Sequence, residues 1–305
     1  MRKSGLTSEL VCRLIAEQFP QWAHLPVRPV ELDGWDNASF RLGDDMSVRL
    51  PSDEAYAAAV DKEHRWLPVL ADQLPLPIPR PLGKGRPGCG FPRSWSVYQW
   101  LPGQPAMFDR IDDLRQFATD LAGFLRALYR IDPAGGPPGG EHNFWRGGPL
   151  TVYDAATRRS IETLADEFDP ARTSAVWEAA LAAPWNGRVV WVHGDVAPGN
   201  LLTENGRLSA VIDFGTSAVG DPACDTAMAW TFFAGDSQDT FKAGLGFDPG
   251  TFARGRGWAL WKSMLVLAGA REDDPEDAAY TRSVIQEILA DHERSSSAAN
   301  STVGP

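Results

Sequence analysis

Cysteine and basic residues are scarce in this chain of 305 residues, and each scarcity limits the class of protein. Cys12, Cys89 and Cys224 lie far apart without CxxC spacing, so neither a disulfide framework nor a zinc site is predicted. Lys and Arg total 29 against 40 Asp and Glu, and no run is rich in basic residues. The net charge of −11 makes nucleic acid and anionic membranes poor partners, whereas it allows a cationic ligand.

Long apolar segments are also missing. The N-terminus has no apolar core of signal-peptide length, and the longest later apolar stretch, residues 258–270, is interrupted by Lys262. We therefore expect a soluble, cytoplasmic protein. The chain contains neither GxxxxGK[ST] nor Gly-x-Ser-x-Gly, which excludes an ordinary P-loop enzyme and a serine hydrolase of that kind.

The pattern of apolar residues changes near residue 101. Before it, a capped helix at 7–19 is followed by short runs typical of strands at 30–50, a helix after residue 51, and strands near 80–83 and 94–100. After it, helical spacing prevails. We predict an α+β protein with an N-terminal lobe at 1–101, a helical lobe at 102–294 and a disordered tail at 295–305, where residues are small and polar.

Oxygen ligands crowd into one stretch of the helical half. Val192 to Leu202 reads Val-His-Gly-Asp-Val-Ala-Pro-Gly-Asn-Leu-Leu, and Val-Ile-Asp-Phe-Gly follows at 211–215. Asp195, Asn200 and Asp213 thus stand next to runs that read as strands. Phosphoryl transfer needs such groups, because hard magnesium ions prefer carboxylate and amide oxygens and a carboxylate can orient the attacking hydroxyl.

This spacing, His-Gly-Asp-x-x-x-x-Asn and then Ile-Asp-Phe-Gly, resembles the aminoglycoside phosphotransferase family, relatives of the protein kinases. The resemblance implies a bilobal kinase-like fold with a small antiparallel sheet and a larger helical lobe. It also implies that Asp195 is the catalytic base, that Asn200 and Asp213 hold Mg²⁺, and that His193 supports the loop. ATP is the implied cofactor, with GTP left open.

The resemblance extends toward the N-terminus. The turn Gly34-Trp35-Asp36-Asn37-Ala38-Ser39 resembles the one that covers the nucleotide phosphates, which implies contacts from Gly34, Asn37 and Ser39. Gln99, Trp100 and Leu101 resemble the hinge that meets adenine. Glu63 stands where the family has a helix glutamate, and Arg49 replaces the lysine of the third strand. We expect Arg49 to bind the α and β phosphates and to pair with Glu63.

The acceptor is the open question. We expect a small molecule, with an aminoglycoside as the first hypothesis and a macrolide, another antibiotic, or a sugar or amino alcohol as alternatives; a nucleotide-binding pseudokinase is a third. The oligomeric state is not predicted. Roles for Asp221 and the 142–148 loop stay open. The helical part contains acidic and aromatic candidates for the acceptor surface, which are Asp221, Asp225, Trp230, Phe232, Phe233, Asp236, Asp239, Trp258, Trp261, Glu272, Asp273 and Asp274. For most of the aromatic residues, packing between helices is the favoured alternative.

Overall fold

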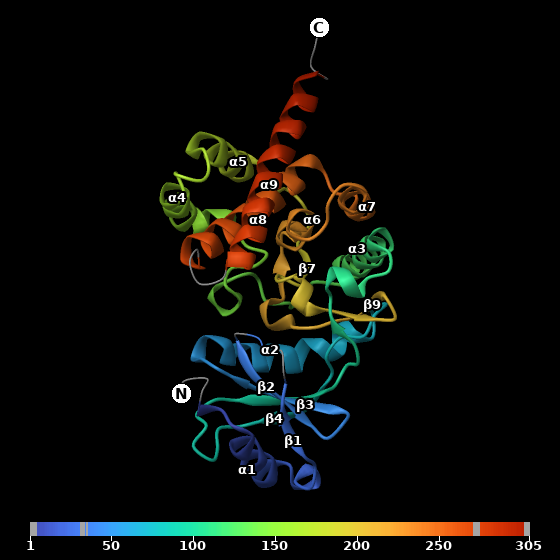
Figure 1. Cartoon of the computed structure of the whole chain (residues 1–305). Coiled ribbons are helices and arrows are strands. Elements are labelled where there is room, and N and C mark those ends of the chain that lie inside the picture. The colour runs from blue at the N-terminus through green and yellow to red at the C-terminus, as the bar shows by residue number, and fades with distance from the viewer. Residues whose placement is uncertain (1–4, 31–33, 35, 271–274, 302–305) are drawn as a thin grey trace.

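A five-stranded antiparallel sheet forms the N-terminal part of the molecule (Figure 1). The structure is a computed structural model and describes residues 5–30, 34, 36–270 and 275–301. In sheet order the strands are β1 (Val27–Pro29), β2 (Asn37–Leu42), β3 (Met46–Pro51), β5 (Trp95–Gln99) and β4 (Pro81–Gly85). Strands near 39–42, 46–50, 80–83 and 94–100 are therefore confirmed. The run at Glu31–Leu32, where another strand was expected, lies outside the described residues.

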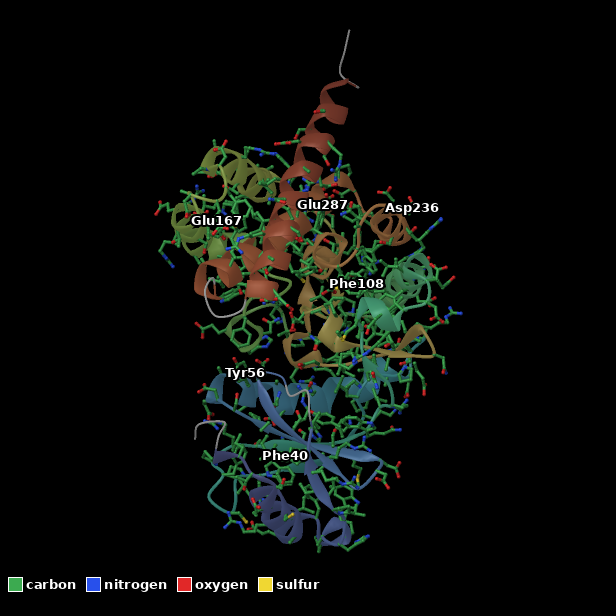
Figure 2. All side chains as sticks on the ribbon, viewed as in Figure 1. Phe40, Tyr56, Phe108, Glu167, Asp236 and Glu287 are labelled. Atoms are coloured by element: carbon green, nitrogen blue, oxygen red, sulfur yellow. The ribbon has the colours of Figure 1, made fainter. Side chains whose placement is uncertain are left out.

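Helices pack on both faces of this sheet (Figure 1). Helix α1 (Ser8–Gln18) begins at Thr7, whose hydroxyl accepts a hydrogen bond from Leu10 N, as the sequence predicted. Its apolar residues share a core with the inward-facing side chains of β2 and β3; Phe40 is among them (Figure 2). Helix α2 (Glu54–Ala71) covers the opposite face and carries Tyr56 at the junction with the second part (Figure 2).

The second part is mainly helical and contains the larger core. Its long helices are α3 (Leu114–Arg130), α4 (Asp154–Thr163), α5 (Pro170–Ala182), α7 (Asp236–Leu245), α8 (Pro249–Ala270) and α9 (Pro275–Ser301), with the short α6 (Met228–Thr231) between α5 and α7. Apolar residues of α3, α5, α8 and α9 meet in one cluster, as their helical spacing predicted. The predicted α+β fold, with a small antiparallel sheet followed by a larger helical part, is thereby confirmed. None of the described helices is long and apolar enough to cross a membrane.

Two small sheets in the second part position the residues of interest. Strand β7 (Val190–Val192) pairs with β10 (Ala218–Gly220), and β6 (Gln104–Pro105), β8 (Leu201–Glu204) and β9 (Arg207–Val211) form the other sheet. The turn between β8 and β9 places Asn205 and Gly206 at φ 51° and 72°, the backbone that a two-residue hairpin needs. The segments after β7 and after β9 are thus brought side by side.

The disordered tail predicted from residue 295 is wrong for residues 295–301, because α9 continues to Ser301. Its polar composition misled the prediction. Ser295 donates its hydroxyl to the carbonyl of Asp291 and accepts from Arg256 Nη2 at 3.0 Å, so contacts with α8 support the extension. Residues 302–305 lie outside the described part of the chain.

Candidate active site

The loop from His193 to Asn200 connects β7 to β8 and ends in the 3-10 helix η6 (Pro198–Asn200). Gly194 adopts φ +84°, and a Cβ there would lie 2.7 Å from the carbonyl oxygen of Thr216. Only glycine fits this left-handed, crowded position without strain. The glycine therefore lets the loop approach the segment after β9 closely.

Two buried side chains hold this loop. The Asp225 carboxylate accepts the backbone N–H groups of His193 and Gly194 at 2.9 and 2.7 Å. The His193 ring accepts from Asp195 N at Nδ1 and donates from Nε2 to the carbonyl of Ile212 at 2.9 Å. His193 thus joins the Asp195 loop to the segment that carries Asp213, as the resemblance implied.

Asp195 projects from this loop with about a third of its side chain exposed (34%). Its Oδ1 accepts from Lys262 Nζ at 2.9 Å, and its Oδ2 accepts from Asn200 Nδ2 at 3.1 Å. Burial alone would raise the pKa of Asp195, but the charges of Lys262, His193 and Arg146 and the Lys262 hydrogen bond hold this pKa below its ordinary value. The carboxylate is therefore ionised and oriented, as a general base must be.

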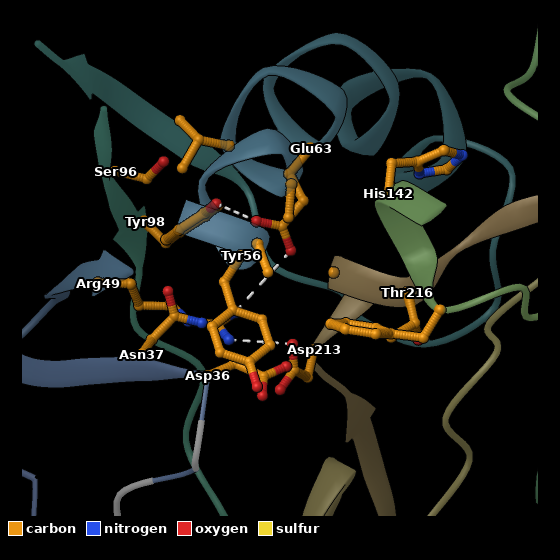
Figure 3. Close-up of a pocket in the computed structure, with 15 residues that line it drawn as sticks. Asp36, Asn37, Arg49, Tyr56, Glu63, Ser96, Tyr98, His142, Asp213 and Thr216 are labelled. Atoms are coloured by element: carbon orange, nitrogen blue, oxygen red, sulfur yellow. Dashed lines mark hydrogen bonds and ion pairs between the residues drawn. The ribbon is translucent and has the colours of Figure 1, made fainter. Parts of the chain in front are cut away.

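Asp213 follows β9 in a left-handed conformation with φ 65°, which is uncommon for a residue other than glycine. Arg49 Nη2 donates to its Oδ1 at 3.0 Å, while Arg49 Nη1 lies 3.9 Å from Glu63 Oε1 (Figure 3). The predicted Arg49–Glu63 pair is therefore present. Tyr98 donates its hydroxyl to the other oxygen of Glu63.

Burial would lower the pKa of Arg49, but the carboxylates of Asp213 and Glu63 more than offset it and raise that pKa. Glu63 itself is buried, and this burial raises its pKa despite the neighbouring guanidinium. Its Oε1 has no hydrogen-bond partner among the described residues and borders a cavity of about 20 Å³, room for roughly one water molecule. Arg49 is thus held from both sides at the junction of the two parts.

A cavity of about 710 Å³ opens between the sheet and the helical part. Its size suits a nucleotide, and Asp195 and Glu63 stand just outside its wall. Predicted site residues that line it are Gly34, Asn37, Ser39, Arg49, Gln99, Trp100, Leu101, Asn200 and Asp213.

At the predicted hinge, two backbone donors are already used. Gln99 N donates to the carbonyl of Arg80 at 2.9 Å and Trp100 N to that of Asp45 at 2.7 Å. The Trp100 ring also carries the Arg41 guanidinium 4.0 Å above its centroid. A base bound there would be met by hinge carbonyl oxygens or by the N–H of Leu101.

Asn200 and Asp213 form a donor set that fits Mg²⁺. Asn200 directs Nδ2 to the backbone and side-chain oxygens of Asp195, so its amide oxygen is the atom left to bind a cation. One amide and one carboxylate suit a metal that keeps most of its shell for water and phosphate oxygens. Within the described chain no group of three His, Cys, Asp or Glu side chains forms a metal cluster.

Most of the candidates for the acceptor surface have structural roles, and the alternative of helix packing is confirmed for the aromatic residues. The Asp221 carboxylate accepts hydrogen bonds of 2.6 and 3.1 Å from buried Arg254. The Asp225 carboxylate is already bound to backbone N–H groups of the 193–200 loop. The five aromatic residues expected there, which are Trp230, Phe232, Phe233, Trp258 and Trp261, are core residues. Asp236 is exposed near Arg115, and residues 272–274 lie outside the described chain. These aromatic side chains fill the core and do not face a ligand, because burial of an aromatic face stabilises the fold.

The 142–148 loop has a bracing role that the sequence left open. Asn143 is fully buried and donates from Nδ2 to the carbonyls of Arg146 and Thr216, both at 2.9 Å. The Cβ of Arg146 lies beside Gly194, and its guanidinium lies over the rings of Trp258 and Trp261. The loop therefore supports the Asp213 segment and places a cation beside Asp195.

Three site cations were not predicted: Lys62, Arg146 and Lys262. Lys262 carried one signal, because it is the charge that interrupts the apolar stretch of α8. Lys62 donates to the carbonyls of Gly215 and Ser217 at 2.6 and 2.9 Å, which ties α2 to the Asp213 segment. No local pattern distinguishes such a lysine from a surface one.

This tie predicts a basic limb in the pH dependence of turnover. Burial lowers the pKa of Lys62 to about 8, since desolvation outweighs the attraction of the Glu63 and Asp213 carboxylates. As the pH rises through about 8, we expect the ammonium to lose its charge, the tie to weaken and kcat to fall. A kcat profile of the wild type and of Lys62→Gln between pH 6.5 and 9.5 checks this, and the limb should be missing from the variant.

The free energy of unfolding should rise over the pH range in which kcat falls. The folded-state pKa of Lys62 lies below its unfolded value, so the unfolded chain binds more protons above pH 8 and the free energy of unfolding rises with pH there, relative to Lys62→Gln. Denaturant unfolding at pH 7 and 9 measures this difference. If the fall of kcat above pH 8 persisted in Lys62→Gln, it would belong to the titration of another group.

Fold and site together are those of a phosphotransferase. A model of the phosphotransferase enzyme family matches residues 27–261, more than half of the chain. The chain therefore belongs to the phosphotransferase enzyme family. The family expected from the His193–Gly215 stretch is confirmed.

Solved structures with this fold include antibiotic kinases. The GDP complex of wild-type aminoglycoside 2'-phosphotransferase-IIIa is 19% identical, with a TM-score of 0.67 over 94% of this chain and 100% of that one. The streptomycin–ATP–APH(2")-IIa ternary complex is 16% identical, with a TM-score of 0.61 over 93% and 98%. Macrolide 2'-phosphotransferase MphH from Brachybacterium faecium is 23% identical, with a TM-score of 0.57 over 91% and 97%.

Proposed function

We propose that this protein transfers the γ-phosphoryl group of ATP to a hydroxyl of a small molecule, with Asp195 as base. The observation that carries the proposal is one cavity lined by Arg49, Asn200 and Asp213, with Asp195 hydrogen-bonded to Asn200 beside it. The acceptor hydroxyl donates to Asp195, its oxygen forms the new bond to phosphorus, and the bond to the ADP oxygen breaks. The hydroxyl proton passes to Asp195.

Each remaining site residue has a binding role in this proposal. Asn200 and Asp213 hold Mg²⁺, which neutralises the charge of the phosphates. Arg49, held by Glu63, binds the α and β phosphates. Gly34, Asn37 and Ser39 cover the phosphates, and the Gln99–Leu101 hinge meets the base of ATP or GTP. We place the boundary between the lobes at Leu101 and Pro102.

An aminoglycoside is the first candidate acceptor. The net charge of −11 attracts a cationic ligand, and aminoglycoside kinases share the fold. A macrolide is the second candidate, for a separate reason. Lys262 and Arg146 flank Asp195, so this corner disfavours the several ammonium groups of an aminoglycoside, and macrolide 2'-phosphotransferase MphH shares the fold.

A phosphorylation screen tests the function. Purified protein with magnesium and ATP or GTP is offered aminoglycosides, macrolides and small metabolic alcohols, and products are identified by mass. We expect one class to be phosphorylated, and not when Asp195→Asn replaces the wild type. Nucleotide binding without turnover of any hydroxyl compound would instead support a regulatory pseudokinase.

A further inference from the structure

Lys262 on α8 reaches across to the catalytic loop and binds the reactive end of Asp195. Its Nζ lies 2.9 Å from Oδ1, while Asn200 occupies Oδ2. A hydroxyl that donates to this carboxylate comes within about 3 Å of it, so it comes within about 6 Å of the ammonium group. The lysine is therefore a neighbour of the reacting oxygen.

The catalytic loop provides no such charge itself. From His193 to Asn200 it contains neither lysine nor arginine, and the cation on the nucleotide side, Arg49, is engaged with Asp213 and Glu63. Phosphoryl transfer develops charge on the oxygens of the migrating group, and a fixed cation beside them stabilises the transition state. A cation on the acceptor side would complete the set.

We propose that Lys262 is this second cation: it orients Asp195 toward the acceptor hydroxyl, and its ammonium group stabilises the oxygens of the phosphoryl group in transit. The proposal rests on the proposed function. The bonds made and broken are those already given, the proton goes to Asp195, and Lys262 keeps its own protons throughout. Helix α8 thereby acts as a positioning element for a loop 67 residues away in sequence.

A structural role for this pair is a weak alternative. The two side chains are 46% and 34% exposed, and exposed ion pairs contribute about 0–1 kcal/mol to stability. Removing the charge should therefore leave the fold intact.

The test compares Lys262→Met, Lys262→Arg and Lys84→Met with the wild type. We expect Lys262→Met to lower kcat about 10- to 100-fold with an unchanged KM for ATP, and Lys262→Arg to restore most of it. Lys84 is the matched control, because it is 45% exposed and pairs with one carboxylate, Asp61, at 2.5 Å. Lys84→Met should behave as the wild type.

The split between kcat and KM is a readout that a purely structural role would not show. Loss of folding would weaken ATP binding as well as turnover, whereas loss of a cation on the acceptor side lowers kcat alone. Recovery in Lys262→Arg then assigns the effect to the charge and not to the packing of the side chain.

Turnover by the wild type separates this test from that of the proposed function, because it shows that the acceptor is phosphorylated. A wild-type kcat in Lys262→Met would overturn the proposal, as would a Lys262→Arg variant that is as impaired as Lys262→Met.

Discussion

Asp195→Asn should reduce kcat about 1,000-fold, because the amide cannot take the hydroxyl proton and general base catalysis contributes about 10²- to 10⁴-fold. The dissociation constant for ATP should stay within about threefold of the wild type, since Arg49 and Asp213 keep their positions. Steady-state kinetics with the acceptor found by the screen, together with calorimetric ATP titration, measure both quantities.

Asp236→Asn is the control for this change of carboxylate to amide. Asp236 lies on the outer surface of α7, with its carboxylate exposed and 3.8 Å from Arg115 (Figure 2). Its turnover should equal that of the wild type. If Asp195→Asn kept kcat within tenfold of the wild type, Asp195 would not be the base and the hydroxyl would have to be oriented by another group.

Arg254→Met should cost about 3–5 kcal/mol of the free energy of unfolding. The pair of Arg254 and Asp221 is buried, and the substitution leaves the Asp221 carboxylate in the core without a cation. It also removes the donor to the carbonyl of Pro184 at 2.8 Å. Denaturant unfolding monitored by tryptophan fluorescence gives the loss.

A double variant separates the buried charge from the packing. Arg254→Met combined with Asp221→Asn should be more stable than Arg254→Met alone, because the neutral amide costs less to bury. Arg172→Met is the exposed control, since its partner Glu293 lies at 2.6 Å on the surface and the loss should stay below about 1 kcal/mol. Equal losses at the two arginines would contradict a special cost at Asp221.

The parts of the site that sequence could predict are those encoded by short spacings. Asp195 follows β7, Asn200 precedes β8 and Asp213 follows β9, so their convergence depends mainly on the β8–β9 hairpin and on the loop between β7 and β8. The pair of Arg49 and Glu63 needed the family resemblance, since strand β3 and helix α2 meet only through the packing of the N-terminal part.

The lysines could not be predicted in the same way. Lys62 and Lys262 contact segments 153 and 67 residues away, and these contacts depend on how whole helices dock. The aromatic residues left two interpretations open for a related reason, a ligand surface or packing between helices. Their number suggested a ligand surface, but the helical part uses them to fill a core whose extent composition alone does not reveal.

Helix α8 links the stability of the protein to its turnover, two properties that usually vary separately. Arg254 and Arg256 form buried pairs with Asp221 and Asp291. Lys262, about 12 Å along the helix axis from Arg254, binds Asp195. A substitution that slides or tilts the helix therefore changes thermal tolerance and turnover together. Adaptive change should therefore proceed through compensating pairs of substitutions along α8. A single stabilising replacement there would also move Lys262 and so change the orientation of Asp195.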